Sequence, residues 1–597
     1  MPHGEEFSNT LLVKVNGTSL PSDIATQMVS GLIDESTRVP DLFVLRFRDP
    51  DGTVLAKGHF EIGAKVELTL QNTAPGGPEP LHVGEVTALE VEIGEAGLHT
   101  VVRGLDVAHR LYRGTRVLAF LNMTASDIVR KVAGTAGVQV QQIDPTTAML
   151  EHTTQAGECD WDFLSRLATE HDRMLTVTAG KLHFIERPEA AGAPSGTDSR
   201  SDQLVLQQGV NLVDLRATIT ASGQVKDVNV RGWDPATKAA VIATKPCATP
   251  SAQTEVGITP AKIASAFPSP SYVVGDARLA NQDVATASAA SLADHVAGGF
   301  AEVEGIAKGN PALRAGSAVK LAGVGAPFVG RYVLTSTRHD FRPATGYRTH
   351  FTASNTSERS LYGTLQDSPA NDPRIVGVVP AVVTNAKDPQ NQGRVKVKVP
   401  WLSDDYESGW CRTVHAGAGS KRGLVILPEV DDEVLISFAH GDLGHPYVLG
   451  GVFNGKDLPK QAWSGQVDGS NGEITTRAWV SRTGMQVVFL EKAGAESLEI
   501  STNNGAQKVL LEQTTKGIKI ISEGPTELTA KQDVTVKSNT TVKVEGINVE
   551  ITGSAGVKIK GATVEIEASG PLKLKGAVTQ VEASGPLTVQ GAIVKIN

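Results

Sequence analysis

Residues 539–597 divide into four blocks that repeat one pattern: NTTVKVEGINVEITG, SAGVKIKGATVEIEA, SGPLKLKGAVTQVEA and SGPLTVQGAIVKIN. A glycine occupies the same place in every block, as Gly546, Gly561, Gly576 and Gly591. Three other places are always aliphatic, and they hold Val542, Val557, Leu572 and Leu587; Val544, Ile559, Leu574 and Val589; and Ile551, Ile566, Val581 and Ile596. One structural unit of fifteen residues is therefore repeated along this stretch.

Each block predicts two short strands separated by turns, because apolar and polar residues alternate and one turn contains the shared glycine. Successive side chains of a strand point to opposite faces, so the shared aliphatic positions face inward while neighbours such as Lys543 and Glu565 face solvent. One chain cannot bury the single apolar face of such a unit, and the blocks lack the bulky residues that fill a single-chain β-helix. We therefore expect three chains to wrap into a β-prism with these positions at its core. A single-chain solenoid is the alternative.

The composition limits what the rest of the chain can be. At 597 residues and 62.7 kDa it is long enough for several cores, and its 61 glycines with 5% aromatic residues favour turn-rich β structure over one large helical bundle. The formal net charge of −9 offers no general attraction to nucleic acid or anionic lipid.

The chain start, MPHGEE, lacks the basic and apolar segments of a secretory signal, and no stretch approaches the ~18 apolar residues of a membrane helix. We therefore expect a protein made in the cytoplasm, which leaves only if some machine exports it whole. The three cysteines, Cys159, Cys247 and Cys411, are far apart and predict buried, reduced thiols.

Short apolar-polar alternation, as in residues 11–15 and 64–70, predicts a β barrel or sandwich at the start of the chain. We expect three helices: one capped by Thr124 or Ser126 with Ile128, Val129 and Val132 on one face, one starting near Asp160 with Phe163, Leu164 and Leu167, and one over 285–300. Strands are expected near 174–177 and 181–185, a loop over 188–202 and a linker over 360–373. Residues 375–454, with strands at 394–399, 424–427 and 433–438, predict a small closed barrel such as an OB-fold.

Conserved-looking motifs of this barrel can be quoted in order: 388–401 DPQNQGRVKVKVPW, 409–412 GWCR, 427–434 LPEVDDEV, 440–442 HGD, 445–446 HP and 450–455 GGVFNG. They resemble the barrel domain of VgrG-type spike proteins of contractile injection systems. Upstream, 161–168 WDFLSRLA, 330–333 GRYV, His339 and 347–349 YRT are similar to the phage late control D and tail-hub half of that family. The stretch 481–484 SRTG resembles the start of its spike prism, although Met485 stands where many members have histidine.

The resemblance implies a mainly β trimer with four parts: a tail-hub-like domain of two β-barrel-like modules with helical insertions over 1–365, an OB-fold barrel over 366–460, a neck and start of the spike over 461–538, and an intertwined trimeric β-prism over 539–597. Six hub modules would match a six-fold tube. The implied function is a non-enzymatic spike and hub at the tip of the inner tube. Implied partners are the inner-tube ring, baseplate proteins, effector cargo and, transiently, a target membrane, in a particle assembled in the cytoplasm.

Two other functions stay open, a baseplate hub of a contractile phage and a surface-glycan depolymerase or adhesin on a β-helical stalk. Only residues 456–480 separate the barrel motif from the prism start, too few for an inserted enzyme. We expect His440, Asp442 and His445 to be structural, and 417–423 GAGSKRG to be a barrel loop because it leads into a strand where a phosphate loop needs a helix. With few aromatics besides Trp401 and Trp410, nucleic-acid binding is not expected, nor is any metal or cofactor.

The sequence given stops after the fourth block, which leaves the last strands of a prism with open backbone groups. Relatives of the resembled family cover this end with a small separate protein of the PAAR type. We therefore expect a PAAR-like partner to bind near Ile593, Ile596 and Asn597.

Overall fold

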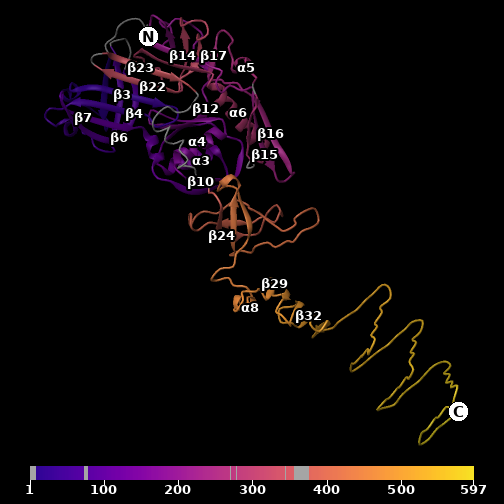
Figure 1. Ribbon diagram of the computed structural model, residues 1–597. Coiled ribbons are helices and arrows are strands. Elements are labelled where there is room, and N and C mark those ends of the chain that lie inside the picture. Colours follow the sequence, from indigo (N-terminus) through magenta and orange to yellow (C-terminus); the bar gives the residue numbers. More distant parts are fainter. Residues whose placement is uncertain are drawn as a thin grey trace. The chain divides into compact units, whose positions relative to one another are not determined.

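The computed structural model describes residues 9–72, 78–268, 270–276, 279–342, 345–354 and 375–596 (Figure 1). These residues form two compact units that divide between Ala462 and Trp463. Strands are the main regular secondary structure in both, as the composition predicts. Among the described residues, none of the helices has the length and apolar character needed to cross a bilayer. The expected linker over 360–373 lies outside the described residues.

The largest sheet has eleven strands and combines the start of the chain with residues near 340. Its order is β14-β19-β23-β22-β3-β4-β7-β6-β5-β1-β2. The strands from the start of the chain are β1 (Asn9–Val15), β2 (Thr18–Ser19), β3 (Met28–Ser36), β4 (Leu42–Arg48), β5 (Lys65–Asn72), β6 (Glu79–Gly94) and β7 (Gly97–Leu105), with the short helices α1 (Ser22–Ala25) and α2 (Val54–Lys57) between them. The later strands are β14 (Leu212–Ile219), β19 (Ala301–Lys308), β22 (Ser336–Arg342) and β23 (Gly346–Ala353).

Strands β3 and β22 join the two halves of this sheet as antiparallel neighbours, with Ser36 opposite Ser336 and Gly31 opposite Phe341. Each half has its own core. Phe43 and Phe47 are fully buried in the first, and Phe300 and Tyr332 in the second. Two apolar cores therefore share one continuous hydrogen-bonded sheet.

The helices begin where local capping dictates. Helix α3 (Ala125–Thr135) is capped by Thr124, whose hydroxyl accepts from the amide of Asp127 at 3.3 Å, so Thr124 rather than Ser126 is the cap. Helix α4 (Asp160–Glu170) buries the expected Phe163, Leu164 and Leu167. Helix α6 (Gln282–Gly298) starts three residues before the predicted 285 because the Asn281 side chain accepts from Asp283 and Val284 amides.

The remaining strands of the first unit form small sheets beside these helices. The strand pair predicted near 174–185 is β11 (Arg173–Thr178) with β12 (Lys181–Glu186), joined by β9 (Val140–Ile143). The others are β8 (Arg116–Thr124) with β10 (Met149–Glu158); β13 (Val205–Gln207), β20 (Ala318–Ala322), β21 (Gly330–Val333) and β17 (Ala252–Thr254), near helix α5 (Pro260–Ala264); and β16 (Ala239–Pro246), β15 (Asp227–Asp234) and β18 (Tyr272–Gly275). The predicted loop over 188–202 contains only a short 3-10 turn, Ala190–Gly192.

The barrel over 375–454 is a five-stranded sheet in the order β25-β24-β27-β28-β26. Its strands are β24 (Val378–Asn385), β25 (Lys396–Lys398), β26 (Arg412–Thr413), β27 (Glu433–Phe438) and β28 (Pro446–Gly451). Its core includes Val383, Val397, Tyr406 and Ile436, against which Val117, Ala119 and Ala156 of β8 and β10 also pack. The five strands confirm the expected small barrel.

Two strand predictions within the barrel need correction. The strand predicted over 394–399 is confined to Lys396–Lys398, because a register shift between Val383 and Asn385 of β24 interrupts the pairing. The stretch 424–427 belongs to no sheet, because no strand among the described residues pairs with it. The sequence predicted a strand here, but a strand also needs a hydrogen-bonded neighbour.

The second unit starts with a short helix, α8 (Trp463–Gln466), and a five-stranded antiparallel meander. The strands are β29 (Thr476–Val480), β30 (Gln486–Leu490), β31 (Ser497–Ser501), β32 (Gln507–Glu512) and β33 (Gly517–Ser522), each paired with the next. Of the described residues after Ser522, none lies in a strand and all are exposed. This stretch, yellow in Figure 1, runs back and forth without the intrachain pairs that a single-chain solenoid requires.

Candidate functional site

The fifteen-residue repeat is repeated in geometry as well as in sequence. The exposed fractions of Val542, Val557, Leu572 and Leu587 are 54–58%, and those of Val544, Ile559, Leu574 and Val589 are 68–72%. At the third position Ile551, Ile566, Val581 and Ile596 are 64–91% exposed. Each block therefore presents the same aliphatic surface, and fully burying one such side chain is worth about 1.5–3 kcal/mol. The single chain does not gain this stabilisation, because it leaves these side chains exposed.

The shared glycines sit where the backbone comes close to itself. A Cβ atom added at Gly561 would lie 2.8 Å from the carbonyl oxygen of Thr563, two residues on. The corresponding distances are 3.2 Å at Gly546 and 3.0 Å at Gly576, whereas Gly591 has 3.6 Å, an ordinary contact. A Cβ atom would therefore clash at Gly561 and be crowded at Gly546 and Gly576, which favours glycine at these three turns.

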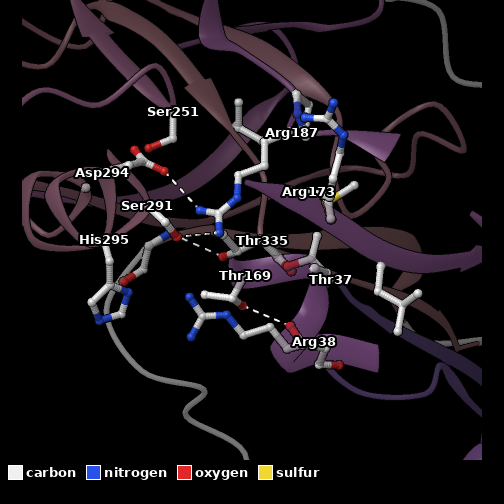
Figure 2. Close-up of a pocket in the computed structure, with 18 of the residues that line it drawn as sticks. Thr37, Arg38, Thr169, Arg173, Arg187, Ser251, Ser291, Asp294, His295 and Thr335 are labelled. Atoms are coloured by element: carbon white, nitrogen blue, oxygen red, sulfur yellow. Dashed lines mark hydrogen bonds and ion pairs between the residues drawn. The ribbon is translucent and has the colours of Figure 1, made fainter. Parts of the chain in front are cut away.

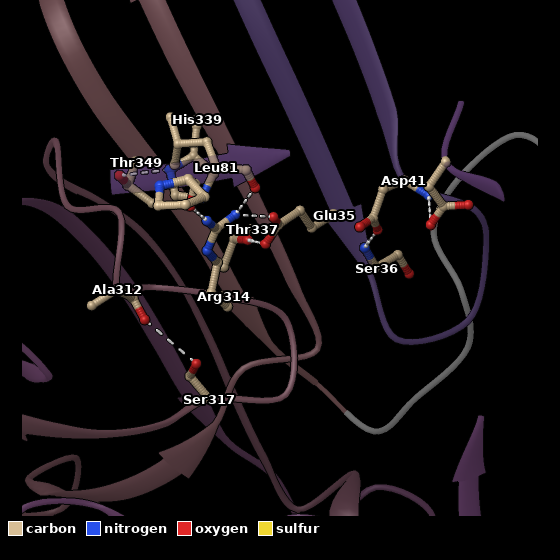
Figure 3. Close-up of polar contacts among 12 residues, drawn as sticks. Glu35, Ser36, Asp41, Leu81, Ala312, Arg314, Ser317, Thr337, His339 and Thr349 are labelled. Atoms are coloured by element: carbon tan, nitrogen blue, oxygen red, sulfur yellow. Dashed lines mark hydrogen bonds and ion pairs between the residues drawn. The ribbon is translucent and has the colours of Figure 1, made fainter. Parts of the chain in front are cut away.

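A buried ion pair lies where the two halves of the eleven-stranded sheet meet (Figure 3). Arg314, between β19 and β20, pairs with Glu35 of β3 and donates to the carbonyl oxygens of Leu81 and, at 2.7 Å, Pro80. The Thr337 hydroxyl of β22 donates to Glu35 at 3.1 Å. Burial raises the pKa of Glu35, and the charge of Arg314 opposes that rise. We call this arrangement the sheet joint; the sequence reasoning missed it.

Histidines beside the sheet joint are kept neutral. His82 and His339 are fully enclosed, and burial, followed by the nearby charge of Arg314, lowers the pKa of each to about 3. His339 Nδ1 lies 2.8 Å from the Tyr347 hydroxyl, and the Thr349 hydroxyl accepts from the Asn310 amide at 3.0 Å. The motif residues His339, Tyr347 and Thr349 therefore form a structural cluster.

Two aspartates lie near the same joint, Asp106 buried and Asp41 half-buried. The Asp41 amide donates to Asp106 Oδ2 at 3.2 Å, and Asp106 Oδ1 accepts from the Ala108 amide at 2.8 Å. Burial raises the pKa of Asp106 to about 7, and burial followed by the negative charge of Asp106 raises that of Asp41 well above its usual range. The Asp106 carboxyl therefore keeps its proton at pH values where an exposed aspartate has lost it.

A cavity of about 800 Å³ opens between α4, β11 and α6 (Figure 2). Arg38, Arg173 and Arg187 line it, and Arg187 is held by Asp294 at 3.1 Å and by the Ser291 hydroxyl at 3.3 Å. Asp162, Glu170 and Asp294 line the same wall, so the charges balance. Its lining comes from separate segments, which is why no motif in the sequence indicated it.

The barrel motif residues have structural roles. Asp388 accepts from the amides of Gln390 at 3.0 Å and Gln392 at 2.8 Å and pairs with Arg394 at 2.7 Å. The Arg394 hydrogen bond is the main cause that lowers the pKa of Asp388. The motif 388–394 is therefore a turn built around one carboxylate. The indole of Trp401 donates to the Pro380 carbonyl at 2.9 Å.

The other candidate chemical groups of the chain are the histidines beside Asp442 and the three cysteines. His445 Nδ1 lies 3.1 Å from Asp442 Oδ2, and the described residues contain no group of three or more acids, histidines and cysteines arranged to hold a metal ion. The cysteines are free and buried, as expected, and burial raises the pKa of Cys159 and Cys411 to about 12. Trp410 has Lys396 Nζ 5.5 Å from its ring centre.

Two family models match the chain. Residues 379–453, the barrel described above, match the Type VI secretion system/phage-baseplate injector OB domain. Residues 8–342, more than half of the chain, match the Alg8 N-terminal domain. The first match places the barrel in the class of injector OB domains.

Curated relatives and solved structures agree with this class. The Type VI secretion system spike protein VgrG5 of Pseudomonas aeruginosa is 34% identical over 126 residues, 20% of this chain and 15% of that protein. VgrG3 of Vibrio cholerae is 32% identical over 99 residues, 15% of this chain and 10% of that protein. The lidded Francisella PdpA-VgrG complex matches with a TM-score of 0.53 and 9% identity over 87% of this chain and 80% of that chain, a likeness of fold.

The chain belongs to the Alg8 N-terminal domain family and, with the injector OB domain that follows, is a VgrG-type spike protein. It covers 10–21% of the length of the curated relatives it matches. What those proteins do as wholes is therefore argued for this chain below.

Proposed function

We propose that three copies of this chain form the spike and hub at the tip of the inner tube of a contractile injection system. The hub domain meets the six-fold tube through two modules per chain, and the repeat forms a three-fold prism that pierces an envelope. The observation that carries this proposal is the repeat itself, whose aliphatic rows are exposed along every block of the single chain. An injector OB domain precedes it in the chain.

The role is mechanical rather than catalytic. Its relatives are spike proteins by name, and the arginines of the cavity, sheet joint and barrel turn, Arg187, Arg314 and Arg394, are each paired with a carboxylate. Sheath contraction would drive the tube forward, and a prism of interlocked strands would resist unfolding during the stroke. A contractile-phage baseplate hub would use the same physics.

Partners follow from this position in the particle. The tube ring and baseplate proteins contact the hub, and effector cargo rides with the spike; one structural relative is a complex of PdpA with VgrG. A PAAR-like protein binds near Ile593 and Ile596, which are 80% and 91% exposed. Asn597, the third residue of this expected contact, lies outside the described residues. Assembly takes place in the cytoplasm.

Native mass spectrometry of the purified protein tests the assembly. We expect a species of three times 62.7 kDa. A folded monomer at micromolar concentration would contradict the prism, because the aliphatic rows would then be exposed in the working state. Glycan turnover by the same preparation would instead favour the depolymerase.

A further inference from the structure

The barrel carries a protruding segment, residues 416–427, which we call the arm. It leaves the barrel after β26 and returns before β27, and every one of its residues is exposed. Gly419 and Arg422 close its tip through two backbone hydrogen bonds of 3.0 and 3.3 Å. The Leu424 amide donates to the Ala416 carbonyl at 2.9 Å, and the Ile426 amide to His415 Nδ1 at 3.4 Å. The arm is thus ordered by its own bonds, with no strand beside it among the described residues.

The returning limb of the arm is unusually apolar for an exposed segment. It consists of four consecutive aliphatic residues, Leu424, Val425, Ile426 and Leu427, whose exposed fractions are 43%, 70%, 53% and 44%. Within the described chain, the amides of Val425 and Leu427 donate no hydrogen bond. A run of exposed aliphatics with open backbone groups is unfavourable in water unless something covers it. The limb is an exposed aliphatic segment that pairs with no strand of the described chain.

Charge indicates what the partner is. The tip carries Lys421 and Arg422, and no ion pair joins either side chain to an acid within the described residues. The same barrel presents Asp404 and Asp405 in an exposed loop, likewise without an ion pair in the described chain. A surface with both halves of a complementary pair fits a second copy of itself.

We propose that each arm crosses to the barrel of a second copy, where residues 424–427 are covered and Lys421 and Arg422 contact Asp404 and Asp405. This rests on the proposed trimer and names the contact that closes its barrel ring. The six residues from 415 to 420 span up to about 20 Å when extended, enough to reach a neighbouring barrel. Each copy gives one arm and receives one, a head-to-tail contact that closes into a ring.

A cysteine pair tests the contact directly. The full-length double variant Lys421→Cys with Asp405→Cys is expected to form disulfide-linked trimers under mild oxidation, seen by non-reducing gel electrophoresis. Each single variant serves as a matched control and should stay unlinked, because the three native cysteines are buried. If the native protein is trimeric and the double variant links no chains, the arm proposal is wrong while the trimer stands. If the native protein is monomeric, both proposals fail.

Charge reversal provides a second test that does not depend on oxidation. The double variant Lys421→Glu with Arg422→Glu is expected to speed subunit exchange between trimers at least tenfold. Adding Asp404→Lys and Asp405→Lys should return the exchange rate to that of the native protein. Val425→Asp should weaken the trimer similarly, whereas Ile62→Asp, at a hub side chain that is 62% exposed, should not. The contact would be overturned if the two lysine substitutions failed to rescue the trimer. It would also be overturned if Val425→Asp and Ile62→Asp had equal effects.

Discussion

At the scale of single residues, buried charge is concentrated around the sheet joint. Arg314 contacts Glu35. Nearby lie two histidines whose pKa is lowered and two aspartates whose pKa is raised. A buried ion pair adds little net stability, yet removing one partner leaves an uncompensated charge. The sheet joint therefore contributes more to the choice of which strands pair than to the net stability of the fold. Removing one of its charged partners should lower the free energy of unfolding by an unusually large amount.

Arg314→Ala tests the joint. Glu35, whose side chain is 8% exposed, would lose its counter-charge, so we expect the hub to lose about 3–5 kcal/mol of unfolding free energy in urea titrations. The control is Arg216→Ala, which removes an ion pair of 3.3 Å from a side chain that is 79% exposed and should cost less than about 0.5 kcal/mol. Adding Glu35→Gln to Arg314→Ala should recover part of the loss; equal effects of both arginine variants would contradict the buried pair.

Asp106 should make stability depend on pH. Its folded pKa of about 7 lies above the ordinary value of 3.8, so between these pH values the folded state holds a proton that the unfolded state has lost. Stability should therefore fall as pH rises from 4 to 7, by up to about 1.4 kcal/mol per unit for one group, and then level off. Asp106→Asn keeps the acceptor for the Ala108 amide and should flatten that slope in urea titrations.

The control for this slope is Asp144→Asn, at an exposed carboxyl whose pKa is lowered by the Gln142 hydrogen bond. Because the pKa of Asp144 lies below pH 4, this variant should retain the wild-type slope of stability against pH between pH 4 and 7. Asp41 faces Asp106 and Glu35 lies close, so some slope should survive in Asp106→Asn. Identical slopes in that variant and the wild type would show that Asp106 titrates normally.

At the scale of elements, the repeat and the arm share one property. Both are extended segments with aliphatic side chains and no strand partner among the described residues. A strand is stable only when its backbone and its apolar face are both covered. In the proposed trimer these elements would be completed by other copies, whereas α3 and α4 are complete within the chain because their apolar faces pack on its own core.

The register of the repeat is tested by adjacent substitutions. Ile566→Asp would place three carboxylates in the apolar prism core, at several kcal/mol each before any shift in pKa, and should abolish the trimer or lower its melting temperature sharply. Glu565→Ala should be nearly silent, because that side chain alternates outward. Since Ile566 is 64% exposed in the single chain, monomer folding is not at risk. Native mass and thermal melting measure both, and equal damage would refute the register.

At the scale of the whole molecule, the proposed interlocking of chains predicts kinetic rather than merely thermodynamic stability. Unfolding one chain of a prism requires breaking contacts with two others, so dissociation should be slow. We expect the native trimer to stay intact in SDS without heating and to run as monomer after boiling. The variant Ile566→Asp should run as monomer in both conditions; a monomer band from an unheated native trimer would contradict interlocked strands.

Local sequence patterns predict the repeat and several helices and strands of this protein. The fifteen-residue period, the apolar faces of α3 and α4, and strand β27 of the barrel follow from spacing and alternation, since these depend on residues near one another in the chain. Thr124 lies three residues before Asp127, so its cap was also within reach of local reasoning, and the barrel motif gave the class of protein.

Contacts between distant segments lay beyond such reasoning. Arg314 and Glu35 are 279 residues apart, and the lining of the cavity comes from several separate elements, so nothing in either local stretch indicates the other. The stretch 424–427 illustrates the same limit: it was predicted to be a strand, but pairing depends on which backbone lies alongside. Chain folding brought no such backbone to it, because a strand partner is a property of three-dimensional arrangement and not of the segment that needs it.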